Sequence, residues 1–393
     1  MQAFTFHTPT EIIFGKGAED NTAALVRKYG GSRALVVYGE GSVVRSGLLD
    51  KITAGLAAEK ITVEPHGGAM PNPHLSFVRA GIKKALAFNA DFILAIGGGS
   101  AIDAAKAIAH GTANPDTDVW KFWTREEALT KTLPFGVVLT ISAAGSETSN
   151  SAVITNTELG LKRGLGTDFN RPRFTVMNPE LTFTVPKYPT ACGIADILMH
   201  TLDRYFTAET TDGGTQSNET TDALAEALMA TVIANAPKVL ANLCDYHAQS
   251  EIMWCGSLSH NGIMGLGRGM DFSVHQLGHE LSGKFDVPHG ASLTTMWGAW
   301  ARYVLSVNPA RFARLGKQVW GVETPEEAIG KTEDFFRVIG TPTNFTELGI
   351  GVQPPEVIDA MAESCTFFGK RLVGSFKPLG KADILAIYSA ANV

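Results

Sequence analysis

The chain has 393 residues, more than one hydrophobic core usually organises, so we expect two domains. Hydrophobic residues make up 45% and charged residues 18%, which is typical of a folded chain with enough apolar material for a core. The formal net charge of −6 argues against a nucleic acid or an anionic membrane as partner, because both favour a basic surface. The four cysteines show no CxxC spacing, and the N-terminus has no basic segment followed by an apolar one. We therefore expect a cytoplasmic protein that acts on a small molecule.

Short apolar runs alternate with helical patterns between residues 32 and 141. The expected strands are RALVVYG, ITVEPHGG, DFILAIG and FGVVL, and the segments between them have helical spacing. Such alternation predicts βαβ units in a mostly parallel, Rossmann-like sheet covered on both faces. Between residues 151 and 179 the polar segment NTELGLKRGLGTDFNRP is flanked by AVIT and RFTVM, which suggests an antiparallel hairpin or an excursion at the sheet edge.

After Pro186 helical periodicity replaces the β pattern, so the second half is expected to be all-α. The segment NPELTFTVPKYPT holds three prolines and marks the boundary. We predict an α/β dinucleotide-binding domain over residues 1–185 and an all-helical domain for metal and substrate over residues 186–393.

Two pairs of metal-ligating residue types lie in this second half, each four positions apart. Asp196 pairs with His200, His275 pairs with His279, and His289 follows in the loop DVPHGAS. Residues i and i+4 project from the same face of a helix, so each pair can present two ligands to one point. A single buried His or Asp is more often a hydrogen-bonded core residue, but the clustering of all five indicates a catalytic metal site with N and O ligands.

Glycine-rich turns follow the expected strands of the first half. DFILAI runs into Gly97, Gly98, Gly99 and Ser100, where a helix opens that carries Asp103 and Lys106. Consecutive glycines let the backbone approach a pyrophosphate, and the free N–H groups and dipole of the helix stabilise that anion. This position allows Lys106 to reach a phosphate or a ribose, with Asp103 either pairing with Lys106 or capping N–H groups of the helix.

A second turn, with Gly39, Gly41 and Ser42, ends the strand RALVVY, and a third, TISAAGS at residues 140–146, ends FGVVL. Small and hydroxyl residues at the second turn leave space for a 2′-phosphate and favour NADP, with Arg45 in the next helix as a compensating cation. Glu40 would repel that phosphate, so NAD stays open as the alternative.

The compound pattern GGGSAIDAAK, TISAAGSE, DILMH, HQLGHEL and DVPHGASL resembles the iron-containing (group III) alcohol dehydrogenases over essentially the whole chain. Within that family the chain is most similar to the butanol dehydrogenase and NADPH-dependent aldehyde reductase branch. The resemblance implies a dehydroquinate synthase-like fold, with a Rossmann-like α/β domain and an all-α metal-binding domain. It also implies a homodimer.

The same resemblance assigns roles to individual residues. It implies that Asp196, His200, His275 and His289 hold one divalent ion, Fe(II) or Zn(II), and that His279 is a non-ligand residue for proton relay. Glu40 and Ala144 depart from the family pattern. The implied cofactor-binding residues are Gly39, Gly41, Ser42, Asn72, Gly97, Gly98, Gly99, Ser100, Asp103, Thr140, Gly145, Ser146, Asn150, Lys162 and Leu181.

The expected chemistry is hydride transfer between NAD(P)H and a small primary alcohol or aldehyde, whose oxygen the metal polarises. A glycerol- or diol-dehydrogenase-like oxidoreductase is the alternative. A dehydroquinate-synthase-like lyase is less favoured, because its phosphorylated substrate calls for several Lys or Arg around the metal. This chain offers chiefly Arg268 near His275.

Overall fold

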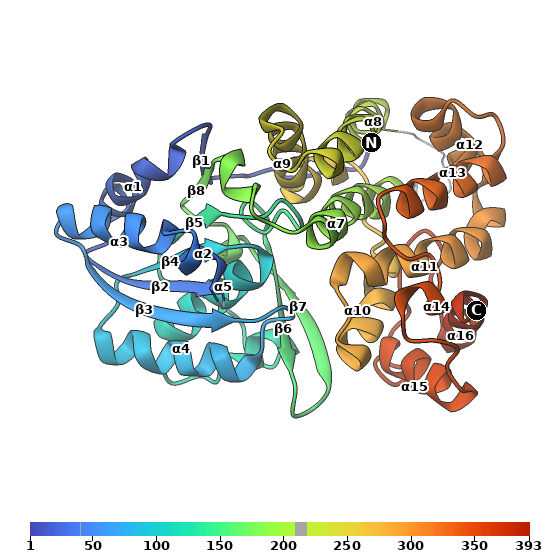
Figure 1. The fold of residues 1–393 in the computed structure, drawn as a ribbon. Coiled ribbons are helices and arrows are strands. Elements are labelled where there is room, and N and C mark those ends of the chain that lie inside the picture. The colour runs from blue at the N-terminus through green and yellow to red at the C-terminus, as the bar shows by residue number, and fades with distance from the viewer. Residues whose placement is uncertain (40, 209–217) are drawn as a thin grey trace. The chain divides into compact units, whose positions relative to one another are not determined.

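The computed structural model describes residues 1–39, 41–208 and 218–393, which form two compact units (Figure 1). One unit is His7–Thr184, and the other combines Met1–Phe6 with Val185–Val393. The sequence placed residues 1–6 in the α/β domain, but the structure groups them with the helical unit. There the Gln2 N–H donates to the Gly267 carbonyl at 2.8 Å.

The first unit contains a six-stranded sheet in the order β1-β8-β5-β4-β2-β3, with every neighbouring pair parallel. Every residue of β4 and β5 is buried, as expected for central strands of a parallel sheet that helices cover on both faces. The predicted α/β architecture is therefore confirmed. The strands are β1 (Glu11–Phe14), β2 (Arg33–Gly39), β3 (Thr62–Ala69), β4 (Phe92–Gly97), β5 (Phe135–Leu139) and β8 (Phe174–Met177).

Helices lie on both sides of this sheet, with α1 and α3 on one side and α4 on the other (Figure 1). Side chains of β2, β4 and β8 such as Val36, Leu94 and Val176 form one core with Val26 of α1 and Ile52 of α3. The helix expected after the second glycine turn is split in two at residues 46–47, because Gly47 adopts φ +76°. The helices are α1 (Thr22–Lys28), α2 (Ser42–Arg45), α3 (Leu48–Ala58), α4 (Leu75–Phe88), α5 (Gly99–Ala113) and α6 (Trp120–Thr124).

The predicted hairpin forms from β6 (Ser151–Asn156) and β7 (Leu161–Gly166), which pair antiparallel with each other. Its second strand is LKRGLG and not RFTVM. The latter run is β8, which lies inside the parallel sheet between β1 and β5. The short edge strand β1 was not predicted.

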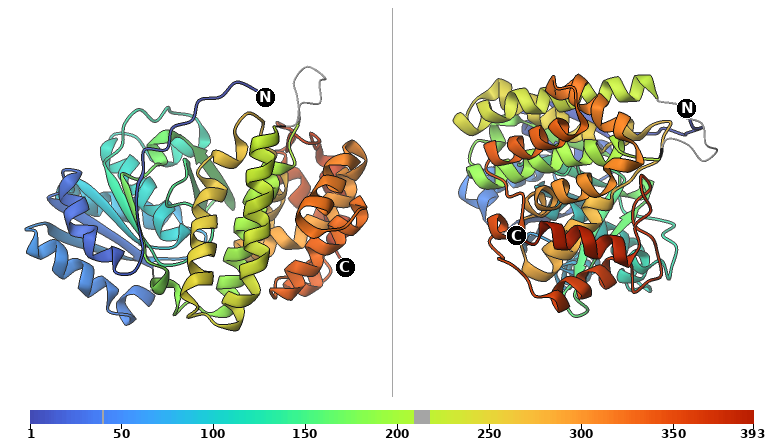
Figure 2. Two further views of the ribbon diagram at one scale, coloured as in Figure 1. Left: turned by 90° about the horizontal axis from the view of Figure 1, so that it is seen from above. Right: turned by 90° about the vertical axis from the view of Figure 1, so that its right-hand side faces the viewer.

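The second unit is helical, as expected, and among its described residues the only β pairing is an isolated bridge between Val373 and Leu379. Its centre is α7, which contacts α8, α9, α10 and α11 and is buried at every position from Thr190 to Tyr205. α7 and α8 lie side by side (Figure 2). The longer helices are α7 (Lys187–Tyr205), α8 (Glu219–Ala241), α9 (Tyr246–His260), α10 (Ser273–Phe285), α11 (His289–Val304), α13 (Pro325–Val338), α15 (Pro355–Cys365) and α16 (Lys381–Ala391); α12 (Pro309–Leu315) and α14 (Phe345–Leu348) are short.

One helix in the described part of the chain, α8, is long and apolar enough to cross a membrane by length and composition alone. Its Asp222 is fully buried and accepts hydrogen bonds from both terminal nitrogens of Arg311, at 2.8 and 2.6 Å. Arg268 lies 2.6 Å from the same carboxylate. Arg314 Nη1 is a third partner, at 3.7 Å, and a buried carboxylate paired with three arginines fits a helix in the core of a folded unit.

Candidate metal centre and nucleotide-binding loops

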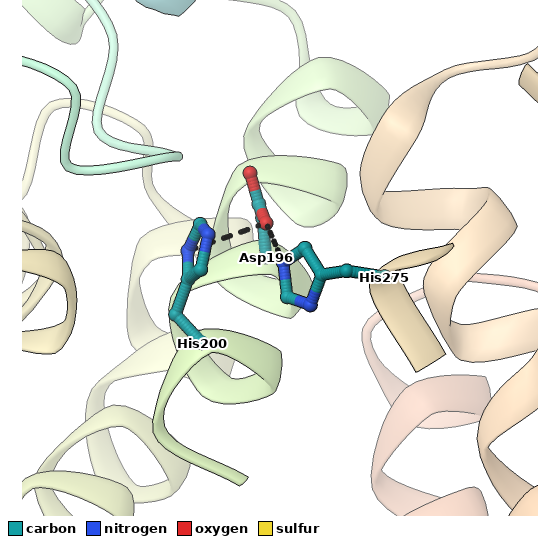
Figure 3. Close-up of side chains that lie close together, drawn as sticks. All are labelled: Asp196, His200 and His275. Atoms are coloured by element: carbon teal, nitrogen blue, oxygen red, sulfur yellow. Dashed lines mark ion pairs between the residues drawn. The ribbon is translucent and has the colours of Figure 1, made fainter. Parts of the chain in front are cut away.

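Two helices of the second unit bring a carboxylate and two imidazoles together (Figure 3). Asp196 and His200 lie one turn apart on α7, and His275 lies on α10. The Asp196 Oδ1 atom is 3.4 Å from His200 Nδ1 and 3.6 Å from His275 Nε2. One ligand atom from each of the three residues lies within 4.8 Å of the others.

These three side chains are buried, and the atoms that face one another have no hydrogen-bond partner. The atoms are Asp196 Oδ1, His200 Nδ1 and His275 Nε2. Leaving a buried polar atom unpaired costs roughly 1 to 3 kcal/mol, so three such atoms at one point call for a ligand. One carboxylate oxygen and two imidazole nitrogens form a donor set that fits a divalent transition metal.

The electrostatics of the cluster also favour a cation. Burial opposes the charged form of His275, yet Asp203 and Asp196 raise its pKa to about 9. Burial lowers the pKa of His200 well below its usual value, and the neighbouring His260 and His275 act in the same direction. The cluster therefore attracts positive charge at His275 while keeping His200 neutral, the form in which imidazole binds a metal.

His289 and His279, the other two histidines of the predicted site, lie at its edge. His289 is the first residue of α11, and its Nε2 is 3.8 Å from Asp196 Oδ1. It does not belong to the group of three whose ligand atoms all lie within 4.8 Å of one another. His279 is partly exposed on α10, one turn beyond His275, and its ring centroid is 5.3 Å from that of His289.

Three further residues contact the cluster, and none of them was among the residues assigned from the sequence. The ring centroid of His260, on α9, is 4.0 Å from that of His200. Asp203 Oδ2 lies 2.5 Å from His275 Nδ1. Phe272, just before α10, has a left-handed backbone with φ +56°, and its ring centroid is 5.0 Å from that of His275. The sequence held a signal for Asp203, because positions 196, 200 and 203 share one helical face.

In the first unit, the predicted cofactor residues follow the carboxyl ends of several strands. Because these strands are parallel, those ends share one edge of the sheet, where doubly wound folds bind nucleotides. The Thr140 N–H donates to the Gly97 carbonyl at 3.1 Å, which joins the loops after β4 and β5. Gly39 ends β2, Gly41 and Ser42 open α2, Asn72 follows β3, residues 97–100 join β4 to α5, residues 140–150 follow β5, Lys162 lies in β7, and Leu181 lies in a short 3₁₀ helix after β8; Glu40 is outside the described residues.

The turn between β4 and α5 fits a phosphate group. No side chain caps the N-terminus of α5, so its first N–H groups are available to an anion. A Cβ atom at Gly98 would lie 2.1 Å from Ile141 Cγ2, so a larger residue here would have to displace the Ile141 side chain from the neighbouring loop.

Asp103 of α5 connects the loop after β5 to the hairpin. Its carboxylate accepts hydrogen bonds from Ser146 Oγ at 2.5 Å and from the Val153 N–H at 2.8 Å. Lys106 is fully buried and donates to the carbonyls of Ser146 and Ser151, at 2.8 and 2.7 Å. The expectation that Lys106 reaches a phosphate is therefore wrong, because its ammonium group is held inside the unit. Burial lowers the pKa of Lys106 to about 8.

The remaining contacts of predicted cofactor residues hold loops to one another. Lys162 Nζ donates to Asn72 Oδ1 at 2.9 Å, and Asn72 has a left-handed backbone with φ +54°. The Asn150 carbonyl accepts hydrogen bonds from the Thr167 N–H and from Asn170 Nδ2. These contacts tie the loop after β3 and the loop before β6 to the hairpin.

Two family models match the chain in tandem. "Iron-containing alcohol dehydrogenase" matches residues 9–179, and "Fe-containing alcohol dehydrogenase family, C-terminal" matches residues 190–392.

Individual proteins and solved structures agree with the family models. The chain is 38% identical to NADH-dependent butanol dehydrogenase A of Clostridium acetobutylicum, covering 99% of each chain. It is 31% identical to the NADPH-dependent aldehyde reductase YqhD of Escherichia coli, covering 91% of this chain and 92% of that one. A crystal structure of NADH-dependent butanol dehydrogenase A from Thermotoga maritima has a TM-score of 0.95 and 30% identity, covering 100% of this chain and 99% of that one.

The matches span both units, and the donor set of the cluster on α7 and α10 suits the metal that gives the family its name. The chain belongs to the iron-containing alcohol dehydrogenase family, and it is a metal-dependent, NAD(P)-linked alcohol oxidoreductase.

Proposed function

We propose that this protein interconverts a small primary aldehyde and its alcohol, with Asp196, His200, His275 and His289 as ligands of one divalent metal ion. The observation that carries the proposal is the convergence of three buried ligand atoms without hydrogen-bond partners, on Asp196, His200 and His275. The names of the relatives, butanol dehydrogenase and aldehyde reductase, support the substrate class.

When bound, a divalent ion at this site supplies Lewis-acid polarisation of the substrate oxygen. Asp196 contributes the one negative charge of the ligand set, and the histidines are neutral, so the ligands offset only one of the charges of a divalent ion. In this proposal His279 exchanges a proton between the substrate oxygen and solvent, and its partial exposure and its position beside His289 support that role. The uncapped start of α5 and the turn at Gly98 bind the pyrophosphate of the cofactor.

For the cofactor we propose NADP, with NAD as the alternative. Gly39 and Ser42 present no bulky or acidic side chain at the end of β2, which leaves space for a 2′-phosphate. The Arg45 guanidinium folds over Gly41, where a Cβ atom would lie 2.8 Å from its Nη1, so a cation is available beside this turn. The relatives divide: four with 34 to 38% identity are named NADH-dependent, and two with 30 and 31% identity are named NADP- or NADPH-dependent.

The ligand set suits both Fe(II) and Zn(II), and iron follows from the family. We propose a homodimer in the cytoplasm, on the strength of the family resemblance and the acidic composition. Light scattering coupled to gel filtration tests whether the protein is a dimer. A panel of aldehydes, butanol, diols and glycerol separates the proposed substrate class from a diol dehydrogenase, a class suggested by a relative named 1,3-propanediol dehydrogenase at 27% identity.

The proposal is tested by metal content and turnover in two histidine variants. His275→Ala removes a buried ligand of the cluster, whereas His247→Ala removes an exposed histidine on α9 of the same unit. We expect about one metal ion per chain in the unsubstituted protein and in His247→Ala, with NAD(P)H-dependent aldehyde reduction in both. His275→Ala should lose both properties. Full metal content in His275→Ala would overturn the ligand assignment.

A further inference from the structure

A second carboxylate on α7 holds the far side of the His275 ring. Asp203 is fully buried, and its Oδ2 lies 2.5 Å from His275 Nδ1, while the other ring nitrogen faces Asp196. We propose that Asp203 is a positioning residue for the metal, which fixes the orientation and the tautomer of His275. This inference rests on the proposed function, because it takes His275 as a metal ligand.

The direction of the hydrogen bond follows from the chemistry of the two groups. An ionised carboxylate only accepts hydrogen bonds, so His275 Nδ1 carries the proton and donates it to Asp203. In the neutral ring the lone pair is then on Nε2, which is 3.6 Å from Asp196 Oδ1 and faces the cluster. A carboxylate that accepts from the outer nitrogen of a ligand histidine fixes the ring and raises its basicity as a ligand.

The backbone around Asp203 is rigid, which suits a residue that orients the His275 ring. Asp203 lies three residues after His200 on the same buried helix, so the support and two ligands share one rigid element. Its own carbonyl accepts a hydrogen bond from the Asp271 N–H at 3.0 Å, just before α10 begins. The start of the helix that carries His275 is therefore tied to the turn of α7 that carries Asp203.

The side chain of Asp271 holds the start of α10 as well. Its carboxylate accepts hydrogen bonds from the N–H groups of Ser273, Ser375 and Phe376, at 3.0, 2.7 and 2.8 Å. The first turn of α10 is thus anchored both to α7 and to the segment that precedes α16. With its backbone held in this way, the remaining freedom of His275 is rotation of the ring, which the hydrogen bond to Asp203 restricts.

The other contacts of Asp203 do not account for a buried charge at this position. Among the described residues, its Oδ1 has no hydrogen-bond partner, so the side chain makes one hydrogen bond, to His275. Burying a carboxylate is costly unless it is paired. Phe272, the residue after Asp271, has a strained left-handed backbone. Its ring centroid is 5.0 Å from that of His275 and 6.1 Å from that of His200.

The test measures metal affinity with zinc alone, by competition against a chromophoric chelator. Asp203→Asn keeps the size of the side chain and an acceptor oxygen, but its amide satisfies either tautomer of His275. We expect the dissociation constant for zinc to rise 10- to 100-fold. Glu226→Gln is the matched control, because Glu226 is also buried in this unit but its partners are Tyr205 and Arg314. Its zinc affinity should stay within about threefold of the unsubstituted protein.

An Asp203→Asn affinity within threefold of the Glu226→Gln value would overturn the inference, since a purely structural role predicts equal effects. Asp203→Glu keeps the test decisive if the Asn variant does not fold: it restores the charge and should bind zinc more tightly than Asp203→Ala. Equal affinities of those two variants would also overturn the inference. Failure of the proposed function gives a different result, in which His275→Ala binds zinc as tightly as the unsubstituted protein.

Discussion

Gly290 allows α11 to approach α7 so closely that the two backbones touch beside the cluster of ligand residues. A Cβ atom at this position would lie 2.0 Å from the Cys192 carbonyl oxygen and 2.7 Å from its carbon. Cys192 is one turn before Asp196, and Gly290 follows His289 directly. Replacing Gly290 by alanine must therefore separate the two segments that bring His289 and Asp196 together.

The size of this displacement follows from the contact distance. Real Cβ atoms essentially never approach another heavy atom closer than 3.0 Å, so the start of α11 must move by about 1 Å. The atoms that would clash are backbone atoms, which cannot rotate away. Metal-ligand distances tolerate only about 0.2 Å, so a shift of this size removes His289 as a ligand. We expect zinc to bind at least 10-fold more weakly, and overpacking to lower the free energy of unfolding by about 1 to 3 kcal/mol.

The assay combines zinc competition with urea denaturation of the metal-free protein. Gly330→Ala is the control, because Gly330 lies inside α13 and a Cβ atom there meets nothing within 4 Å. Alanine should raise the stability at that position by about 0.5 to 1 kcal/mol and leave zinc affinity unchanged. If Gly290→Ala bound zinc as tightly as Gly330→Ala does, the close approach of α11 would not be what places His289.

Three further outcomes are expected. His279→Phe should lower turnover at least 10-fold while elemental analysis still finds the metal; loss of metal would make His279 a ligand instead of a proton-relay residue. Gly39→Asp should shift the ratio of kcat/KM from NADP toward NAD, because the carboxylate occupies the space of the 2′-phosphate, and an unaltered ratio would refute this. Burial opposes the charged form of Asp383, but Lys377 and Tyr303 lower its pKa from 3.8 to about 2. That stabilisation is fully present above pH 3.8 and is lost as the pH falls through about 2. Asp383→Asn should therefore lower the free energy of unfolding by about 1 kcal/mol at pH 7, allowing for solvent screening, and by almost nothing at pH 2. Urea titrations at the two pH values measure this, and an equally large difference at pH 2 would refute the assignment.

Local spacing was enough to predict the residues that α7 contributes to the cluster. Asp196 and His200 are one turn apart, so a helix at this position must place them on one face. Asp203 lies on the same face, but its partner His275 is 72 residues away on α10. A contact of that sequence separation depends on how helices pack, which periodicity does not specify.

The errors in the first unit have a similar origin. Lys106 follows a glycine turn and was expected to reach a phosphate, but helical spacing does not show that hydroxyl and carbonyl groups of the loop after β5 surround its ammonium group. The polar segment before RFTVM predicts that this run flanks a hairpin, yet it forms β8 in the interior of the parallel sheet. A short apolar run predicts a strand, but its neighbours in the sheet are chosen by tertiary contacts.

The assignment of Met1–Phe6 to the helical unit means that this unit is discontinuous in the sequence. A truncation that starts at Val185 would omit a segment that belongs to the unit and would leave the Gly267 carbonyl without the Gln2 N–H. Dissection of the protein into two independently folding fragments would therefore need a circular permutation that joins residues 1–6 to the helical part. A simple cut at the domain boundary would give an incomplete fragment.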